Sequence, residues 1–276
     1  MNFTYKYKIG TLKILFTSLL TIVLLVSISC STDETQTVTT YNNLTLSQEF
    51  DIDGAPDSSV WGYDIGTGSN GWGNNELQYY TDRSENINIE DGVLKFNIIK
   101  ESYEGSGYTS ARLLTKDLFE QKYGRIEARI QLPWGQGLWP AFWMLGANSE
   151  VSWPQVGEID IMENRGQEPT LVSGSVHGPG YFASEGITKS YELENDRFDT
   201  GFHIFGIEWG EDYINYYVDD VLYNQITPED VTGEWVFNQP FYIIMNVAVG
   251  GDYPGSPNNT TVFPQTMLVD YVRVYQ

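Results

Sequence analysis

Apolar and polar residues alternate along most of this chain, and a period of two is typical of strands that bury one face. The clearest case runs from Tyr123 to Leu132, where Ile126, Ala128 and Ile130 share one face and charged or amide side chains share the other. Further strands are expected at residues 202–209, 213–218, 241–249 and 267–275. After residue 43, no stretch of about 15 residues keeps a helical period, so the pattern predicts an all-β protein.

Turn residues separate these apolar stretches. Ile87-Asn-Ile89 and Val93-Leu-Lys-Phe-Asn-Ile98 flank Glu90-Asp91-Gly92, which predicts a hairpin with glycine where a positive φ is needed. The chain has 27 glycines, and its turn signals recur about every 8–12 residues, as in antiparallel sandwiches. Without a repeat or a second linker, residues 44–276 are expected to form one domain, a sandwich of two antiparallel sheets.

A short positive segment and an apolar run open the chain. Lysines at positions 6, 8 and 13 precede an apolar run from Ile14 to Ile28. This run is shorter than most membrane-spanning helices and ends abruptly. The layout therefore predicts a signal peptide over residues 1–29.

Cys30 follows the apolar run and is the only cysteine, which excludes a disulfide within the chain. A small residue, this cysteine and the polar sequence after it resemble a bacterial lipoprotein signal, in which Cys30 becomes lipidated. An ordinary secretory peptide with an incidental cysteine is the alternative. Residues 30–43 are polar and are expected to be a tether. The prediction is an exported cell-surface or outer-membrane lipoprotein, or otherwise a secreted protein, that meets the membrane only through this anchor.

The charge balance narrows the choice of partner. The formal net charge is −22 at pH 7, and removal of the lysine-bearing signal peptide makes it more negative. Such a surface repels nucleic acid, anionic lipid and sulfated or uronic polysaccharides. A neutral partner is favoured.

Three carboxylates stand within six residues of strand-forming sequence. Glu158 and Asp160 alternate with isoleucines, so an extended strand places both acids on one face. Glu163 falls on the opposite face of a regular strand, where it is a buried and unpaired charge. One extra residue at Ile161 or Met162, a β-bulge, returns Glu163 to the face of Glu158.

This arrangement is suited to hydrolysis of a glycosidic bond. That reaction needs one carboxylic acid to protonate the leaving oxygen and one carboxylate to attack the anomeric carbon or activate water. Glu158 and Glu163 are suited to these parts, and Asp160 between them raises the pKa of its neighbours. The two glutamate carboxyls are expected about 5–5.5 Å apart, the separation of a retaining pair. The alternatives are a solvated strand face or a cation site.

Four tryptophans at positions 134, 139, 143 and 153 are interleaved with glycine and proline. Any single one more often belongs to a core, but four in loop-rich sequence suggest flat apolar platforms for sugar rings. Asp270 is a separate oddity. It shares parity with Leu268, Val272 and Val274, so it is expected on an apolar face with either a cation or an arginine as its partner.

The segment Glu158-Ile-Asp-Ile-Met-Glu163 resembles the signature of glycoside hydrolase family 16, in its longer form with the extra bulge residue. The surroundings are similar to its bacterial endo-1,3-β-glucanase (laminarinase) branch, and the similarity spans residues 44–276. The blocks that carry it are Gly73-Asn-Asn-Glu-Leu-Gln-Tyr-Tyr80, Tyr123-Gly-Arg-Ile-Glu-Ala-Arg129, Leu138-Trp-Pro-Ala-Phe-Trp-Met-Leu145, Val176-His-Gly-Pro-Gly180, Phe202-His-Ile-Phe-Gly-Ile-Glu-Trp209 and Asn246-Val-Ala-Val-Gly-Gly251. Asp252-Tyr253 and Asn164-Arg165 depart from common laminarinases.

The resemblance implies a concanavalin-like β-jelly-roll sandwich with a concave substrate cleft, no organic cofactor and a monomer. It implies that Glu158 is the nucleophile, Glu163 the general acid/base and Asp160 the residue that tunes both. Substrate-binding positions implied in the same way are Asn75, Arg112, Trp139, Trp143, Trp153 and His177. His177 is expected near Glu163, with a purely structural histidine as the alternative. A structural Ca²⁺ is implied at Glu49, the Gly92 carbonyl and Asp270.

The expected function is that of a retaining endo-acting hydrolase of neutral, laminarin-like β-1,3-glucan. Within the same family, action on mixed-linkage β-1,3/1,4-glucan or on an algal galactan is the alternative. The negative charge argues against a sulfated galactan, which needs a basic cleft. A surface glucan-binding lipoprotein without catalysis is the alternative from another class, although all three acids are present.

Overall fold

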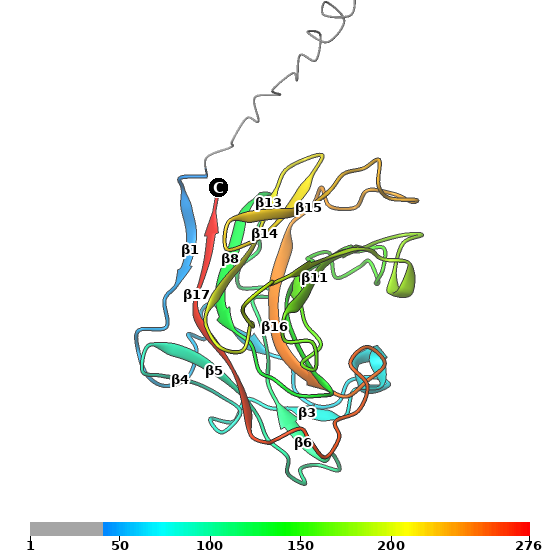
Figure 1. Cartoon of the computed structure of the whole chain (residues 1–276). Coiled ribbons are helices and arrows are strands. Elements are labelled where there is room, and N and C mark those ends of the chain that lie inside the picture. The colour runs from blue at the N-terminus through cyan, green and yellow to red at the C-terminus, as the bar shows by residue number, and fades with distance from the viewer. Residues whose placement is uncertain (1–40) are drawn as a thin grey trace, which may run out of the picture. The chain divides into compact units, whose positions relative to one another are not determined.

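Two large antiparallel sheets pack face to face in this computed structural model, which describes residues 41–276 (Figure 1). One sheet has the order β15 (Val221–Ile226), β14 (Ile214–Val218), β13 (His203–Trp209), β8 (Gly124–Gln131), β17 (Gln265–Tyr275), β5 (Val93–Ile98) and β4 (Ile87–Glu90), and β1 (Leu44–Gln48) also pairs with β17. The predicted signal peptide and Cys30 lie outside the described residues.

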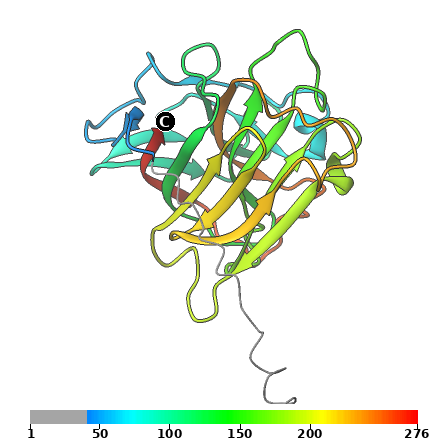
Figure 2. The same ribbon diagram turned by 90° about the horizontal axis from the view of Figure 1, so that it is seen from above.

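The second sheet has the order β12 (Ile187–Glu192), β11 (Leu171–His177), β10 (Glu158–Glu163), β9 (Leu138–Gly146), β16 (Phe241–Val249), β7 (Arg112–Leu114) and β2 (Gly62–Tyr63). A small parallel pair joins β3 (Gln78–Tyr80) to β6 (Tyr108–Ser110). Figure 2 shows the layers from above. The expected all-β jelly-roll sandwich is confirmed.

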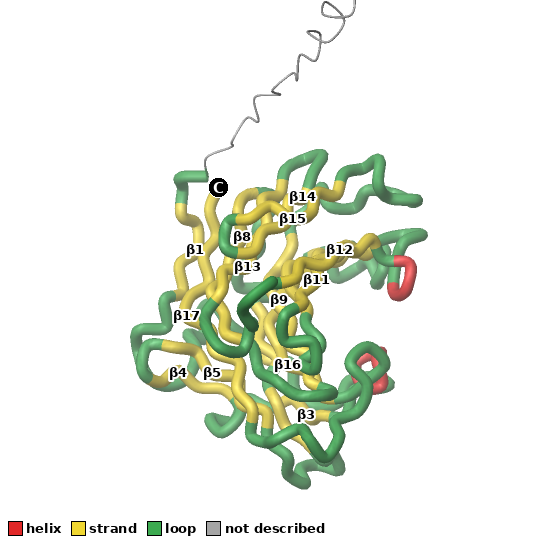
Figure 3. The backbone as a smooth tube through the Cα atoms, viewed as in Figure 1, coloured by secondary structure: helices red, strands yellow, loops and turns green. Residues whose placement is uncertain are grey.

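Helical structure in the described part is confined to two short turns, a π-helix η1 (Gly71–Asn75) and a 3₁₀-helix η2 (Ala183–Glu185). Both project on the side away from β1 (Figure 3). Among residues 41–276, no helix has the length and apolar character needed to cross a bilayer.

The core lies between the two sheets and follows the alternation. Ile126, Ala128 and Ile130 of β8 are fully buried, as expected, and meet Phe142 and Met144 from β9 in one apolar cluster. β16 is buried at all nine positions, because its two faces pack against different clusters. This double burial accounts for its nearly continuous apolar sequence.

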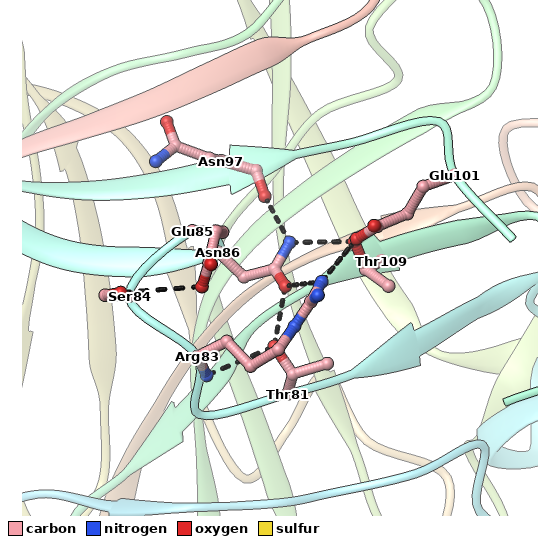
Figure 4. A network of polar contacts seen from close by, with 8 residues as sticks. All are labelled: Thr81, Arg83, Ser84, Glu85, Asn86, Asn97, Glu101 and Thr109. Carbon is pink, nitrogen blue, oxygen red and sulfur yellow. Dashed lines mark hydrogen bonds and ion pairs between the residues drawn. The ribbon is translucent and has the colours of Figure 1, made fainter. Parts of the chain in front are cut away.

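The expected hairpin is present between β4 and β5. Asp91 and Gly92 both have positive φ, at 57° and 76°, which is the backbone that a two-residue hairpin turn requires. A polar network then fastens this hairpin to β6 (Figure 4). The buried Asn86 amide donates to Asn97 O at 3.0 Å and to Thr109 Oγ1 at 3.0 Å, and its own oxygen accepts from Arg83 at 2.9 Å.

The first described residues already belong to the folded unit. Asn43 N donates to Gln276 O at 3.1 Å, and Gln276 N donates to Asn43 O at 2.8 Å. The Tyr41 hydroxyl lies 3.1 Å from the Tyr213 hydroxyl. The last residues of the predicted tether therefore extend the edge of β1 against the C-terminus.

Asp270 does not lie on the apolar face that its parity predicts. The β8–β17 register shifts between Val269 and Tyr271, so Val269 before the shift and Val272 after it both face the core. Asp270 points outward with 35% of its side chain exposed and accepts from Arg129 Nη1 at 2.7 Å. The parity argument was wrong because it assumed a regular strand, and the arginine alternative is the one observed.

Candidate active site

A β-bulge interrupts β10 at the point that the sequence predicts. Against β11, Asp160 pairs with Ser175 and Glu163 with Ser173, so two residues of β10 stand opposite a single residue of β11. Against β9, the shift falls between Asp160 and Met162. Ile161 and Met162 are both buried, because the extra residue lets the strand keep its apolar side chains in the core.

The bulge brings the three acids to one face of the sheet. Across the β9–β10 ladder, Glu158 stands opposite Leu145, Asp160 opposite Trp143, and Glu163 opposite Ala141. Directly paired residues share a face, and Ala141, Trp143 and Leu145 alternate along β9. We call the side of the seven-stranded sheet that bears these residues the carboxylate face.

His177 lies opposite Glu158 on β11, rather than beside Glu163 as expected. Its Nε2 lies 3.1 Å from Asp160 Oδ2 and 3.9 Å from Glu158 Oε1. One donor atom from each of these three residues falls within 4.8 Å of the others, a spacing that could hold a metal ion. The same spacing brings the imidazole within ion-pair distance of both carboxylates.

Burial and mutual repulsion shift the pKa of every acid in this group. Burial raises the pKa of Glu158 well above its usual range, the Asp160 charge raises it further, and His177 opposes the shift. Burial raises the pKa of Asp160 to about 7. Burial and Asp160 raise the pKa of Glu163 to about 8, against a hydrogen bond from Trp139. The three acids therefore share protons near neutral pH and titrate as a coupled group.

Glu163 has a hydrogen-bond donor on β9. Trp139 Nε1 donates to Glu163 Oε1 at 2.9 Å, and the Trp139 ring packs against Tyr253 with centroids 5.0 Å apart. Trp139 is therefore both an aromatic surface and a direct partner of a predicted catalytic group. Tyr253 therefore belongs to the same corner of the carboxylate face.

Trp143 and Arg112 form a second corner. The Arg112 guanidinium lies 4.8 Å from the Trp143 ring centroid and 4.7 Å from that of Trp72, and its Nε lies 3.0 Å from Asp64 Oδ2. Trp143 Nε1 donates to Asn246 Oδ1 at 2.8 Å. Two indoles sandwich the guanidinium, an arrangement that stabilises a cation and fixes both rings.

Trp153 and Asn75 lie at the margins. Trp153 precedes β10 in a loop, is 44% exposed, and packs edge-on against Phe182 with ring centroids 5.4 Å apart. Its ring centroid is 6.5 Å from that of His177. Asn75 Nδ2 donates to both carboxylate oxygens of Asp252 at 3.1 Å. The exposed indole offers a platform, whereas the Asn75 amide links η1 to the loop of Tyr253.

The implied calcium ligands do not fit a bound ion in this conformation. Both carboxylate oxygens of Glu49 accept from Arg273, at 2.8 and 2.7 Å, and Asp270 accepts from Arg129. Gly92 occupies the β4–β5 turn. Two of the three donor groups therefore already have cationic partners.

Several residues of the site were not assigned from the sequence, among them Tyr253, Phe182 and Asn246. Asn246 is buried, and besides receiving the Trp143 hydrogen bond it donates to the Tyr80 hydroxyl at 3.1 Å. A signal for it was present, since it is the only amide or charged residue in the strand Phe241–Val249. Phe182 and Tyr253 lie in loops, where alternation gives no orientation.

The carboxylate face can perform acid–base and nucleophilic chemistry at an acetal carbon. It holds two glutamates with raised pKa, a histidine–aspartate pair beside one of them, and indoles suited to the apolar faces of sugar rings. Its charged groups are mostly acids, which matches a substrate without negative charge.

Comparisons with known proteins point in the same direction. Residues 71–273 match the family model described as glycosyl hydrolases family 16. A β-glucanase of Rhodothermus marinus is 44% identical over 244 residues, covering 84% of this chain and 85% of that protein.

Solved structures agree with the sequence relatives. The laminarinase catalytic domain from Thermotoga maritima superposes with a TM-score of 0.82 at 48% identity, covering 86% of this chain and 99% of that one. The endo-β-1,3-glucanase from Pyrococcus furiosus gives a TM-score of 0.81 at 46% identity, covering 87% and 98%.

Proposed function

Because this chain belongs to glycosyl hydrolase family 16, we propose that it is a retaining, endo-acting hydrolase of laminarin-like β-1,3-glucan. The observation that carries the proposal is the bulge in β10, which turns Glu163 to the face of Glu158 and Asp160. The laminarinase relatives support β-1,3-glucan as the substrate.

The reaction proceeds in two displacements. The Glu158 carboxylate attacks the anomeric carbon while Glu163 gives its proton to the departing glycosidic oxygen, so the sugar–oxygen bond breaks and a glycosyl ester forms on Glu158. Glu163, now a carboxylate, takes a proton from water as that water attacks the same carbon. The ester breaks, Glu158 is released as a carboxylate, and two inversions leave the anomeric configuration unchanged.

The electrostatics support this division of roles. A pKa of about 8 keeps Glu163 protonated near neutral pH, as a general acid requires. Glu158 must ionise to attack, and two groups lower its pKa against burial and the Asp160 charge: His177, 3.9 Å away, and the Trp153 side chain.

The neutral substrate follows from charge and from the aromatic surfaces. Trp139, Trp143 and Trp153 offer faces to pyranose rings, and the acids beside them repel sulfated chains. Incubation with laminarin and measurement of new reducing ends tests the proposal. Laminarin is expected to yield a mixture of oligosaccharides, with slower release from lichenan and none from agarose. An absence of reducing ends from laminarin leaves the glucan-binding alternative.

We further propose that the protein is exported, lipidated at Cys30 and monomeric. The residue pattern of positions 1–30 supports the first two. Metabolic labelling with a radioactive fatty acid tests them, because Cys30→Ala should abolish the label. Size-exclusion chromatography of residues 41–276 tests the third.

Structural calcium stays a prediction that the arginine pairs of Glu49 and Asp270 oppose. Thermal melting with calcium and with a chelator tests whether calcium binds, since a ligand of the native state raises the midpoint of unfolding. An unchanged midpoint removes Glu49, Gly92 and Asp270 as ligands.

A further inference from the structure

Two residues that follow strands of the seven-stranded sheet, Arg165 and Tyr253, meet beside the acid/base. Arg165 follows β10 by two residues, and its guanidinium carbon lies 5.3 Å from the centroid of the Tyr253 ring. The Tyr253 ring packs on Trp139 at 5.0 Å between centroids, with 47° between the ring planes. Trp139 Nε1 in turn donates to Glu163 Oε1 at 2.9 Å. A continuous series of contacts therefore runs from Arg165 through Tyr253 and Trp139 to Glu163. We call this series the tyrosine relay.

Independent contacts hold the loop that carries Tyr253. The carbonyl of Pro254 accepts from Gln136 Nε2 at 2.8 Å and from Gln167 Nε2 at 3.0 Å. Asp252, on the other side of Tyr253, accepts from Asn75 at 3.1 Å. Both backbone neighbours of Tyr253 are thus tied to other segments, so its ring does not rely on Trp139 for its position.

The Arg165 side chain is also restrained. Its Nη2 lies 2.6 Å from Glu168 Oε2. The ion pair therefore holds the guanidinium in place where it meets the Tyr253 ring.

The Trp139–Glu163 hydrogen bond determines which carboxyl oxygen faces the substrate. With Oε1 engaged by the indole, the proton to be transferred belongs on Oε2. An indole that tilts away loses this bond and lets the carboxyl rotate, because a hydrogen bond depends steeply on its angle. The packing of Tyr253 against the ring opposes such a tilt.

We infer that Tyr253 is a positioning residue for Glu163, acting through the indole of Trp139, and that Arg165 steadies the Tyr253 ring. The inference rests on the proposed role of Glu163 as the general acid. It predicts a loss that depends on the leaving group, because only a poor leaving group needs a well-aimed proton.

The test compares two substrates by kcat/KM, which reports the steps up to formation of the glycosyl ester. Laminarin departs as an alcohol and needs protonation, whereas 2,4-dinitrophenyl β-laminaribioside releases a stable phenolate without it. Tyr253→Leu should lower kcat/KM about tenfold on laminarin and leave the aryl glycoside within about twofold of wild type. Tyr253→Phe keeps the ring and should restore wild-type behaviour on both.

Phe182→Leu is the matched control, because Phe182 is another exposed aromatic residue packed on an indole, that of Trp153. It should change both substrates by the same factor. Arg165→Ala leaves the Tyr253 loop intact and should give the Tyr253→Leu pattern at smaller size, about threefold on laminarin only. This variant decides the question if Tyr253→Leu does not fold.

The inference is overturned if Tyr253→Leu, folded by its melting curve, slows both substrates equally or slows neither. Where Tyr253→Leu does not fold, an Arg165→Ala variant with no selective loss on laminarin overturns it as well. Glu163→Gln is the reference. If Glu163→Gln itself shows no dependence on the leaving group, the proposed function fails, and this result is distinguishable from a failure of the relay alone.

Discussion

His177 Nε2 lies 3.1 Å from Asp160 Oδ2 and comes from the residue directly opposite Glu158 in the β10–β11 ladder. The imidazole thus stands between the two acids at the nucleophile end of the site. A protonated His177 lowers the pKa of Glu158 and of Glu163. His177 is therefore a group that opposes the rise in the pKa of Glu158 caused by burial and by the Asp160 charge.

Replacing His177 by alanine should move the acidic limb of the pH profile of kcat/KM to higher pH. The sign follows from the charge: without the imidazolium, the pKa of Glu158 rises, and a higher pH is needed to form the attacking carboxylate. The chain has one other histidine, His203, so His203→Gln is the control, with an unchanged profile. An acidic limb that stays in place excludes this role for His177.

Removal of either glutamate should separate the two displacements. Glu158→Ser should lower hydrolysis of laminarin by at least about 10³-fold, with binding retained, since the tryptophan platforms remain. Glu163→Ala should slow laminarin by about 10²–10⁴-fold but spare the aryl glycoside in kcat/KM. Reducing-end assays and calorimetric titration with laminari-oligosaccharides measure these effects. Near-normal turnover of laminarin by either variant refutes the assignment.

Asn246→Ala should weaken substrate binding and lower stability together. The variant removes the acceptor of the Trp143 indole and the donor to the Tyr80 hydroxyl. Unpaired buried groups of this kind cost about 1–3 kcal/mol, and a Trp143 ring without its anchor should raise KM more than it lowers kcat. Denaturant unfolding and initial-rate kinetics provide the two readouts. Asn224→Ala is the control, because Asn224 is also a buried asparagine but lies on β15; an equal rise in KM there contradicts the prediction.

The His203–Asp219 pair should stabilise the fold only over a window of pH. His203 Nδ1 lies 2.7 Å from Asp219 Oδ2, and the hydrogen bond to Asp219 raises the pKa of His203. Although burial opposes it, the His203 hydrogen bond leaves the pKa of Asp219 below its usual value. The stabilisation from His203 is full below its unfolded pKa of about 6.5 and is lost as pH rises through the folded pKa. That from Asp219 is lost as pH falls below about 3.9.

Melting curves of wild type and His203→Gln should therefore differ most near pH 5–6, by about 2 °C. The difference should shrink as the pH rises through the raised folded pKa of His203, above which His203 is neutral in both the folded and the unfolded state. A difference that is constant from pH 5 to pH 9 indicates a packing effect of the ring instead.

Most strands were predictable because the sandwich buries one face of each, and β16, buried on both faces, was predictable as a continuous apolar run. Tyr123–Leu132 became β8 (Gly124–Gln131), and 241–249 matched β16 residue for residue. The bulge in β10 was also predictable, because a regular strand buries the Glu163 charge at high cost. The bulge at Asp270 could not be predicted in the same way. Asp270 points outward because it pairs with Arg129, and that pairing depends on which strand lies beside β17.

Strand register and loop conformation limited what could be predicted of the site. His177 was expected near Glu163, but it pairs with Glu158 across the β10–β11 ladder. The register of the two strands determines such partners, and the sequence alone does not give that register. No role was assigned to Tyr253 from the sequence. Its packing on Trp139 depends on tertiary hydrogen bonds from Gln136 and Gln167 that no local pattern encodes.

The order of strands has a consequence for how the chain reaches its fold. The last two strands, β16 and β17, lie in the interior of the two sheets: β16 between β9 and β7, and β17 between β8 and β5. Neither sheet is continuous until β16 and β17 have paired, so the strands that precede them in the chain keep unpaired edges until then. Such non-local pairing slows folding and exposes the intermediates to aggregation. A chain that ends before Gln265 should therefore lack a cooperative melting transition, even though every residue of the carboxylate face is present.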